Sequence, residues 1–245
     1  MAETIPYFVA PNDPSLVCEN VQFPGSAGTV KGYFARPKDG TRLGAVVVIH
    51  ENRGLVDHIR DIARRLAKEG FAALAVDFLS GQGGTEQFKT PEEAIQAIGK
   101  VSKDSVVADA NSAVAYLKKQ SFANGKIGVV GFCWGGGHSL NFATKAKDLN
   151  AAVVFYGRNP DPLDDVKNIP CAVLGNYGED DPNIMPGVEP LKQALSKNGK
   201  KFDIKTYPSA KHAFNNNTNA DRYHPEAAKD AWARTINFFK QNLAA

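Results

Sequence analysis

The chain has 245 residues, of which 43% are hydrophobic and 22% charged, and its 29 Lys and Arg against 26 Asp and Glu leave a net charge of only +3. These proportions are those of an ordinary globular protein, and they argue against a disordered chain or a fibrous repeat. The basic residues are scattered along the chain instead of forming a stripe, so we expect no nucleic-acid partner.

The first predicted elements are two strands over about residues 15–36. Segments 15–23 and 28–36 mix polar and apolar residues and are separated by Pro-Gly-Ser-Ala-Gly, which predicts an antiparallel pair at the edge of a sheet. The later strands have another pattern. They are short apolar runs rich in Val and Ala, typical of parallel strands covered on both faces: 43–50, 71–77, 126–132, 151–156, 171–177 and 202–207.

Helical spacing occurs between these runs. Ile59, Ile62 and Leu66 recur at helical intervals, residues 106–117 nearly do, and a broad apolar stripe runs from Ala228 to Phe239. Strands joined by such helices predict a three-layer α/β sandwich, with a mostly parallel central sheet and helices on both faces. We expect residues 1–245 to form a single domain, with its ligand beyond the carboxyl ends of the strands.

The strongest motif is Gly131-Phe-Cys133-Trp134-Gly135, which follows a predicted strand directly and opens a predicted helix. It has the form of a nucleophile elbow with Cys in place of Ser. The sharp turn lifts the side chain out of the sheet, and the helix N-terminus favours a thiolate. The N–H of Trp134 is then a candidate donor to an oxyanion. The alternative is an inert, buried cysteine in a glycine-rich turn.

Two later strand ends supply a carboxylate and an imidazole, in the order nucleophile, acid, base. The strand 171–177 is followed by a turn, Gly178-Glu-Asp180-Asp181-Pro182, and the strand 202–207 by a loop that carries His212. We expect His212 to accept the thiol proton. We expect Asp181, in preference to Asp180, to orient the His212 imidazole. The alternative for each residue is a solvated surface position.

A further acidic residue follows the strand that ends at His50, in the sequence Glu51-Asn52-Arg53-Gly54. Glu51 is directed at the same edge of the sheet as Cys133, where its charge would favour the neutral thiol. An ion pair with Arg53 is the alternative. We expect the Asn52 N–H to be the second oxyanion donor, and His50 to line the substrate pocket without acting as the base.

Four motifs together resemble the dienelactone hydrolases, or carboxymethylenebutenolidases, of the α/β-hydrolase superfamily, over about residues 25–243. They are His50-Glu-Asn-Arg-Gly-Leu55, Gly131-Phe-Cys-Trp-Gly-Gly136, Gly178-Glu-Asp-Asp-Pro182 and His212-Ala-Phe214. The resemblance implies an α/β-hydrolase fold with these roles: nucleophile Cys133, base His212, orienting acid Asp181, thiol-holding Glu51, and oxyanion donors Asn52 and Trp134. It also implies that substrate entry displaces Glu51, which then takes the Cys133 proton. No metal or organic cofactor is expected.

The sequence departs from this family where the substrate is selected. The well-known dienelactone enzymes bind the substrate carboxylate with two arginines, and Gly81 and Asn216 stand at those positions here. Neither can form a charged fork with a carboxylate. Arg53 and Arg222 are candidate substitutes, with surface ion pairs as their alternative role. We therefore do not expect dienelactone itself to be the physiological substrate.

The sequence thus predicts a cysteine-dependent hydrolase of lactones, especially enol-lactones, or of activated carboxylic esters, through an acyl-enzyme on Cys133. A thioesterase or general carboxylesterase on the same residues is a close alternative. From another class, the alternative is a redox-sensing or binding protein that uses Cys133 without hydrolysis. The expected partner is a small lactone or ester, and the protein is expected to be a monomer or a homodimer.

The remaining expectations concern location and cysteine chemistry. No apolar stretch approaches the ~20 residues that cross a bilayer, and the first residues lack a signal-peptide pattern, so we expect a cytoplasmic protein. Cys18, Cys133 and Cys171 are an odd number without a CxxC pair, which argues against a disulfide framework and a structural zinc site.

Overall fold

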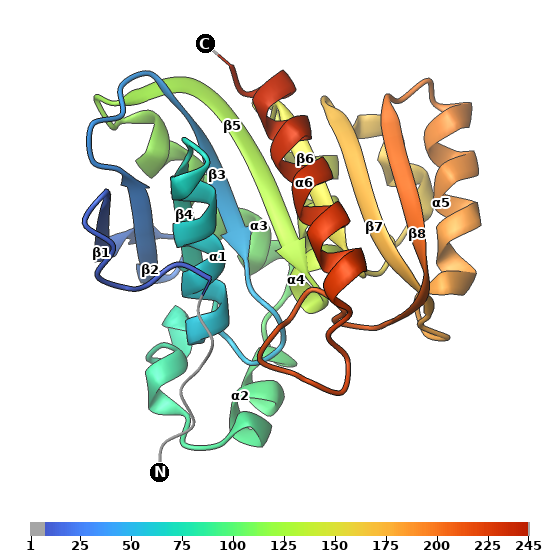
Figure 1. Ribbon diagram of the computed structural model, residues 1–245, viewed down its shortest axis with the longest axis horizontal. Coiled ribbons are helices and arrows are strands. Elements are labelled where there is room, and N and C mark those ends of the chain that lie inside the picture. Colours follow the sequence, from blue (N-terminus) through green and yellow to red (C-terminus); the bar gives the residue numbers. More distant parts are fainter. Residues whose placement is uncertain (1–7, 245) are drawn as a thin grey trace.

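The central element of the computed structural model, which describes residues 8–244, is an eight-stranded sheet with helices on both faces (Figure 1). The strands are β1 (Leu16–Gly25), β2 (Gly28–Pro37), β3 (Leu43–Ile49), β4 (Ala72–Asp77), β5 (Ala123–Phe132), β6 (Ala151–Phe155), β7 (Ala172–Asp180) and β8 (Phe202–Lys211). The α-helices are α1 (Asp57–Lys68), α2 (Pro91–Ile98), α3 (Lys103–Lys118), α4 (Trp134–Lys145), α5 (Met185–Lys197) and α6 (Pro225–Asn242).

The strand order across the sheet is β1-β2-β4-β3-β5-β6-β7-β8. β1 and β2 form an antiparallel pair at one edge, and β2 also pairs antiparallel with β4. The six strands from β3 to β8 are all parallel to one another. The predicted edge pair and the predicted parallel sheet are therefore confirmed, and the carboxyl ends of the parallel strands meet at one edge.

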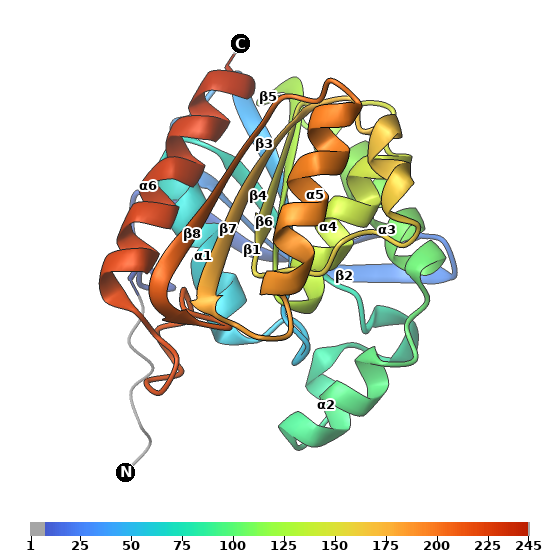
Figure 2. The same cartoon turned by 90° about the vertical axis from the view of Figure 1, so that its right-hand side faces the viewer.

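Alternation along β3 shows why its sequence is uniformly apolar. Val46 and Val48 pack in the cluster that includes α1 and α6, whereas Val47 and Ile49 pack in the cluster that includes α3, α4 and α5. All four side chains are fully buried. Figure 2 shows the resulting three layers, with α1 and α6 on one side of the sheet and α3, α4 and α5 on the other.

The last two strands are longer than their apolar runs predict. β7 continues to Asp180 and β8 to Lys211, and these two residues pair after an irregularity that follows Gly178. The predicted turn after residue 177 and the predicted loop after residue 207 are therefore wrong. Backbone hydrogen bonds extend a strand whatever its side chains, so the polar ends of β7 and β8 carried no apolar signal.

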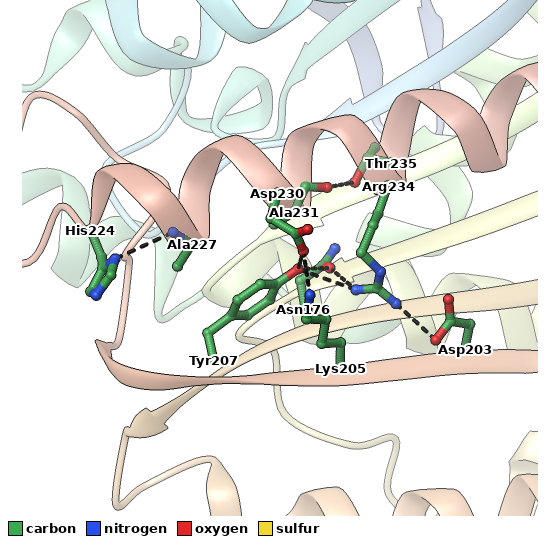
Figure 3. A network of polar contacts seen from close by, with 10 residues as sticks. All are labelled: Asn176, Asp203, Lys205, Tyr207, His224, Ala227, Asp230, Ala231, Arg234 and Thr235. Carbon is green, nitrogen blue, oxygen red and sulfur yellow. Dashed lines mark hydrogen bonds and ion pairs between the residues drawn. The ribbon is translucent and has the colours of Figure 1, made fainter.

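A polar network fixes α6 to the two strands that lead to Asp181 and His212 (Figure 3). Arg234 of α6 donates to Asn176 Oδ1 of β7 at 2.7 Å and pairs with Asp203 of β8 at 2.8 Å. The hydroxyl of Tyr207 in β8 donates to Asp230 of α6 at 2.8 Å. These contacts hold β7 and β8 in position relative to each other. They thereby help to position Asp181 and His212, which follow these two strands.

Candidate active site

The turn between β5 and α4 has the backbone of a nucleophile elbow. Cys133 lies between the end of the strand and the start of the helix, with φ 55° and ψ −115°. Its N–H donates to the carbonyl of Phe155 at 3.1 Å, and its carbonyl accepts from the N–H of Gly137 at 3.2 Å. A non-glycine residue in such a conformation costs on the order of 1–3 kcal/mol and persists only where the surroundings fix it.

Two glycines allow the elbow to pack closely against the sheet. A Cβ atom on Gly131 would lie 1.8 Å from the carbonyl oxygen of Gly135, and a Cβ atom on Gly135 would lie 2.3 Å from that of Ile49. These are backbone atoms that cannot move aside independently. The Gly-x-Cys-x-Gly pattern therefore reflects the close passage of β5, the turn, α4 and β3.

The predicted acid and base are in contact beside this elbow. His212 Nδ1 lies 2.5 Å from Asp181 Oδ2, and His212 also hydrogen bonds to Cys133. Asp181 is 1% exposed and accepts a further hydrogen bond at Oδ1 from the N–H of Asn183. Asp180, the last residue of β7, is exposed. The geometry thus favours Asp181 over Asp180 as the partner of the imidazole.

The pKa of His212 is raised to about 9. Burial acts against the charged imidazolium, but the hydrogen bonds to Asp181 and Cys133, and the negative charges of both groups, outweigh it. An imidazolium next to sulfur stabilises a thiolate, which is the nucleophilic form of cysteine. The arrangement is therefore suited to nucleophilic attack by Cys133.

Glu51 lies in the same site, with 7% of its surface exposed. Its Oε2 accepts a hydrogen bond from Asn216 Nδ2 at 2.7 Å, and its Oε1 accepts one from the Tyr156 hydroxyl at 3.5 Å. Burial raises the pKa of Glu51 although the Asn216 hydrogen bond and the positive charges of His212 and Arg53 oppose the rise. Among the described residues no ion pair joins Glu51 to Arg53, which is exposed.

Tyr156 is a site residue that the sequence reasoning missed. It follows β6 directly with φ 40°, it is fully buried, and its ring meets that of His212 edge to face at 5.2 Å. Burial and the negative charges of Glu51 and Cys133 raise its pKa well above the usual value, so the hydroxyl keeps its proton. A polar residue at the carboxyl end of an apolar strand was the available signal.

A cavity of about 1010 Å³ opens over Cys133. Asn52, Trp134, Tyr156, Asp181 and His212 lie in its wall, so it contains both proposed oxyanion donors. The Trp134 N–H is the first of α4, where amides have no helical acceptor.

The cavity wall also carries positive charges from separate segments. Arg222, one of the two expected substitutes, lies in the wall, whereas Arg53 does not. Three further cations were missed because isolated surface residues carry no pattern: Lys103, Arg158 and Lys211. All four side chains are exposed, and none forms an ion pair with another described residue. Two exposed carboxylates, Asp161 and Asp180, lie in the same wall, so the four cations outnumber them and give the cavity a rim with net positive charge, here called the basic rim.

Three other expected positions have a different environment. His50 is fully buried and does not line the cavity, contrary to expectation, because its ring is turned toward the N–H of Phe78 and the carbonyl of Glu51. Gly81 is exposed in the short helix η1 (Ser80–Gln82), outside the cavity wall. Asn216 is buried against Glu51. Neither family arginine position therefore offers an anion site here.

The described chain shows neither a metal centre nor a membrane-spanning element. Among residues 8–244, His, Cys, Asp and Glu side chains form no group of three or more that could hold a metal ion. In the same range, no helix has the length and apolarity that crossing a bilayer requires. The three cysteines are free thiols.

Comparison with known proteins gives consistent matches over nearly the whole chain. The model of the dienelactone hydrolase family matches residues 30–243. A protein of Escherichia coli K12 assigned as a carboxymethylenebutenolidase is 34% identical over 242 residues, covering 94% of this chain and 89% of the relative. A similar assignment in Saccharolobus solfataricus is 33% identical, covering 91% of this chain and 98% of the relative.

Solved structures agree with these sequence matches. A protein from Klebsiella pneumoniae assigned as a dienelactone hydrolase has a TM-score of 0.84 and 32% identity, over 92% of this chain and 99% of its own. A dienelactone hydrolase-like promiscuous phosphotriesterase from metagenomic libraries has a TM-score of 0.82 and 27% identity, over 94% of this chain and 100% of its own.

Proposed function

Because the chain belongs to the dienelactone hydrolase family, we propose that it hydrolyses lactones, especially enol-lactones, or activated carboxylic esters through an acyl-enzyme on Cys133. The observation that carries this proposal is the contact of His212 with both Asp181 and Cys133 at the elbow. The α/β-hydrolase fold and a hydrolase of ester or lactone bonds follow from the family. The nucleophile and the substrate are the proposed parts.

The acylation step uses the residues of the site in sequence. The Cys133 thiolate attacks the carbonyl carbon, and the N–H groups of Asn52 and Trp134 bind the oxyanion. When the intermediate collapses, the C–O bond to the leaving oxygen breaks, and that oxygen takes the proton of the His212 imidazolium. A thioester on Cys133 and a neutral His212 remain.

Deacylation returns the enzyme to its first state. Neutral His212 takes a proton from water as the water oxygen attacks the thioester carbonyl. The C–S bond then breaks, which releases the acid and leaves a thiolate beside an imidazolium. Asp181 orients the ring and stabilises its charge in both half-reactions. Within this proposal, Glu51 holds the resting thiol, takes its proton when substrate displaces the carboxylate, and returns that proton to the Cys133 thiolate once the acid has left.

The thiolate also limits which substrates react. A thiolate is a better leaving group than an alkoxide. The tetrahedral intermediate therefore expels the Cys133 sulfur and returns to substrate unless the leaving oxygen of the substrate departs readily. An enolate or a phenolate departs readily and an alkoxide does not. We therefore expect enol-lactones and p-nitrophenyl esters to react, and simple alkyl esters and amides to react poorly.

A general carboxylesterase or thioesterase is the second candidate, and the size of the cavity favours it. A space of about 1010 Å³ lies at the upper end of small-molecule sites, larger than a five-membered lactone requires. A substrate panel separates the candidates: an enol-lactone, its saturated analogue, a p-nitrophenyl ester, an acyl thioester and a phosphotriester. Tenfold preference in kcat/KM corresponds to about 1.4 kcal/mol.

The decisive test of the chemistry is intact-mass spectrometry after rapid mixing with the enol-lactone. We expect an acyl adduct on the wild-type protein, and neither adduct nor turnover in Cys133→Ala. Undiminished hydrolysis by Cys133→Ala would refute the proposed nucleophile. Ready sulfenic acid formation on Cys133 without adduct or turnover would instead support a redox sensor, against which the contact between Asp181 and His212 weighs.

Two further expectations belong to the proposal. We propose that the chain acts as a single domain in the cytoplasm, on a small-molecule substrate and without an organic or metal cofactor. Cell fractionation tests the location, and full activity after exhaustive chelation tests the independence from metal. Sedimentation tests whether the protein is a monomer or a homodimer.

A further inference from the structure

The carboxylate of Glu51 is held by donors from two separate segments. The Tyr156 hydroxyl comes from the end of β6, and the Asn216 amide comes from the loop between β8 and α6. Glu51 is 7% exposed and Asn216 is 8% exposed, so water has little access to their contact. The Asn216 contact is the shorter, at 2.7 Å from Nδ2 to Oε2.

A third residue determines which end of the Asn216 amide faces Glu51. The Oδ1 of Asn216 accepts two hydrogen bonds from Thr218, one from its hydroxyl at 2.7 Å and one from its N–H at 3.0 Å. With Oδ1 bound in this way, the NH₂ end points at Glu51. The reverse orientation would place the amide oxygen against the carboxylate and the NH₂ group against the Thr218 N–H, so two repulsive contacts would replace attractive ones.

The electrostatic surroundings of Glu51 make this donor important. The charged and titratable groups that act on it are His212 at the end of β8, Arg53 in its own loop and Tyr156 after β6. Burial raises the pKa of Glu51, whereas the Asn216 hydrogen bond lowers it. A buried carboxylate is retained in its ionised form only when such donors offset its desolvation.

We propose that Thr218 and Asn216 form a positioning relay, in which Thr218 orients the Asn216 amide so that its N–H keeps Glu51 ionised and in place beside Tyr156. This inference rests on the proposed function only in that Glu51 is taken to act on the Cys133 thiol. It assigns Asn216 to the enzyme's own carboxylate: its amide is engaged by Glu51 and Thr218, and is not free to bind a substrate group.

The exposed position of Thr218 offers a mild test. Thr218→Val removes the hydroxyl but keeps the shape and the backbone N–H, and Thr218→Ser restores the hydroxyl. Infrared spectroscopy of protein labelled with ¹³C-glutamate follows Glu51 directly, because the band that Glu51→Gln removes identifies its carboxyl. Thermal unfolding confirms that each variant is folded.

We expect the protonation midpoint of Glu51 to rise by about one pH unit in Asn216→Ala, because a hydrogen bond to a charged group is lost. Thr218→Val should move it in the same direction by less, and Thr218→Ser should restore the wild-type midpoint. The acid limb of the kcat/KM profile for p-nitrophenyl acetate should move with it. Wild-type Glu51 titration in either Asn216→Ala or Thr218→Val would overturn the relay.

A matched control removes a hydroxyl that also donates to a carboxylate but lies outside the site. Thr206 donates to Glu179 at 2.8 Å on β8, so Thr206→Val should leave the Glu51 titration unchanged. A shift of equal size in Thr206→Val would overturn the assignment to Thr218. Because the infrared readout needs no turnover, it is independent of the Cys133→Ala experiment that tests the nucleophile.

Discussion

The imidazole of His50 stacks on the indole of Trp134, with ring centroids 5.4 Å apart and planes inclined by 14°. The same imidazole contacts the Phe78 N–H through Nε2 at 3.2 Å and the Glu51 carbonyl through Nδ1 at 2.7 Å. An N–H only donates and a carbonyl only accepts, so Nδ1 carries the proton and the ring is neutral. Burial lowers the pKa of His50 and thus agrees with this tautomer. His50 therefore joins the ends of β3 and β4 to the start of α4.

From this we predict that His50→Ala destabilises the protein by about 2–4 kcal/mol, because it leaves a cavity, removes the acceptor of the Phe78 N–H, and leaves the Glu51 carbonyl with only the Gly54 N–H at 3.3 Å. Urea unfolding at neutral pH measures the loss. His224→Ala serves as the comparison, since His224 caps α6 at its partly buried N-terminus and its loss should cost about 1 kcal/mol. Equal losses in the two variants would contradict a joining role for His50.

Neighbouring aspartates should differ sharply in their effect on activity. Asp181→Asn should lower kcat/KM about a thousandfold or more, because the amide can hold the wrong tautomer of His212. Asp180→Asn should change kcat/KM by less than about threefold, since Asp180 is exposed at the end of β7. Steady-state kinetics on p-nitrophenyl acetate measures both. A larger loss in Asp180→Asn would reverse the assignment.

The raised pKa of His212 predicts a pH-dependent contribution to stability. A group whose pKa is higher in the folded state binds its proton more tightly there, so its stabilisation is complete below the unfolded value of about 6.5. It is lost as the pH rises through about 9. The unfolding free energy of wild type minus that of His212→Gln should therefore decline between pH 6.5 and 9. A difference that stays constant from pH 6 to 10 would refute the charged His212.

Close packing at the elbow predicts very different losses of stability when two glycines of α4 are replaced by alanine. Gly135→Ala should cost about 3 kcal/mol, because its Cβ would meet the Ile49 and His50 carbonyl oxygens at 2.3 and 2.4 Å. Gly137→Ala meets only the Arg158 backbone at 3.3 Å, and alanine favours the helix, so stability should change by less than about 1 kcal/mol. Thermal and urea unfolding compare them. A harmless Gly135→Ala would show that α4 can move away from the sheet.

The basic rim of the cavity predicts a salt effect confined to charged substrates. Increasing ionic strength from 10 to about 200 mM shortens the screening length below 10 Å. The kcat/KM for the mono-p-nitrophenyl ester of succinate should fall several-fold over this range, whereas that for p-nitrophenyl butyrate should change little. The double variant Lys103→Ala, Arg158→Ala should weaken the dependence. Equal salt effects on both esters would show that the rim does not select charge.

Much of the fold was readable from the sequence because its information is local. Apolar runs gave the core strands, and alternation gave the edge pair formed by β1 and β2. Helix α2 was missed although Thr90 and Glu93 form a capping box around Pro91, because its eight residues are too few for a clear period. The ends of β7 and β8 were missed because backbone pairing leaves no mark on side-chain type.

The site was predictable to the extent that its residues follow strands. Cys133, Asp181 and His212 stand where parallel strands deliver them to one edge, and the structure brings all three together. The partners of Glu51 were not predictable. Asn216 lies 165 positions away in the sequence, and only the folded loop places its amide on the carboxylate. For His50 the sequence correctly predicted a position at the end of a strand. It wrongly predicted that the ring lines the cavity, because the ring is turned toward the Phe78 N–H.

The separation of the proposed reacting groups from the basic rim affects how this enzyme can evolve. Cys133 and His212 stand at strand ends fixed by the shared sheet, whereas Lys103, Arg158 and Arg222 are exposed residues of the cavity wall. Replacement of an exposed cation disturbs neither the sheet nor the elbow. Under the proposed function, a single substitution in this rim is therefore expected to change the charge preference for substrates while the elbow and the sheet stay intact.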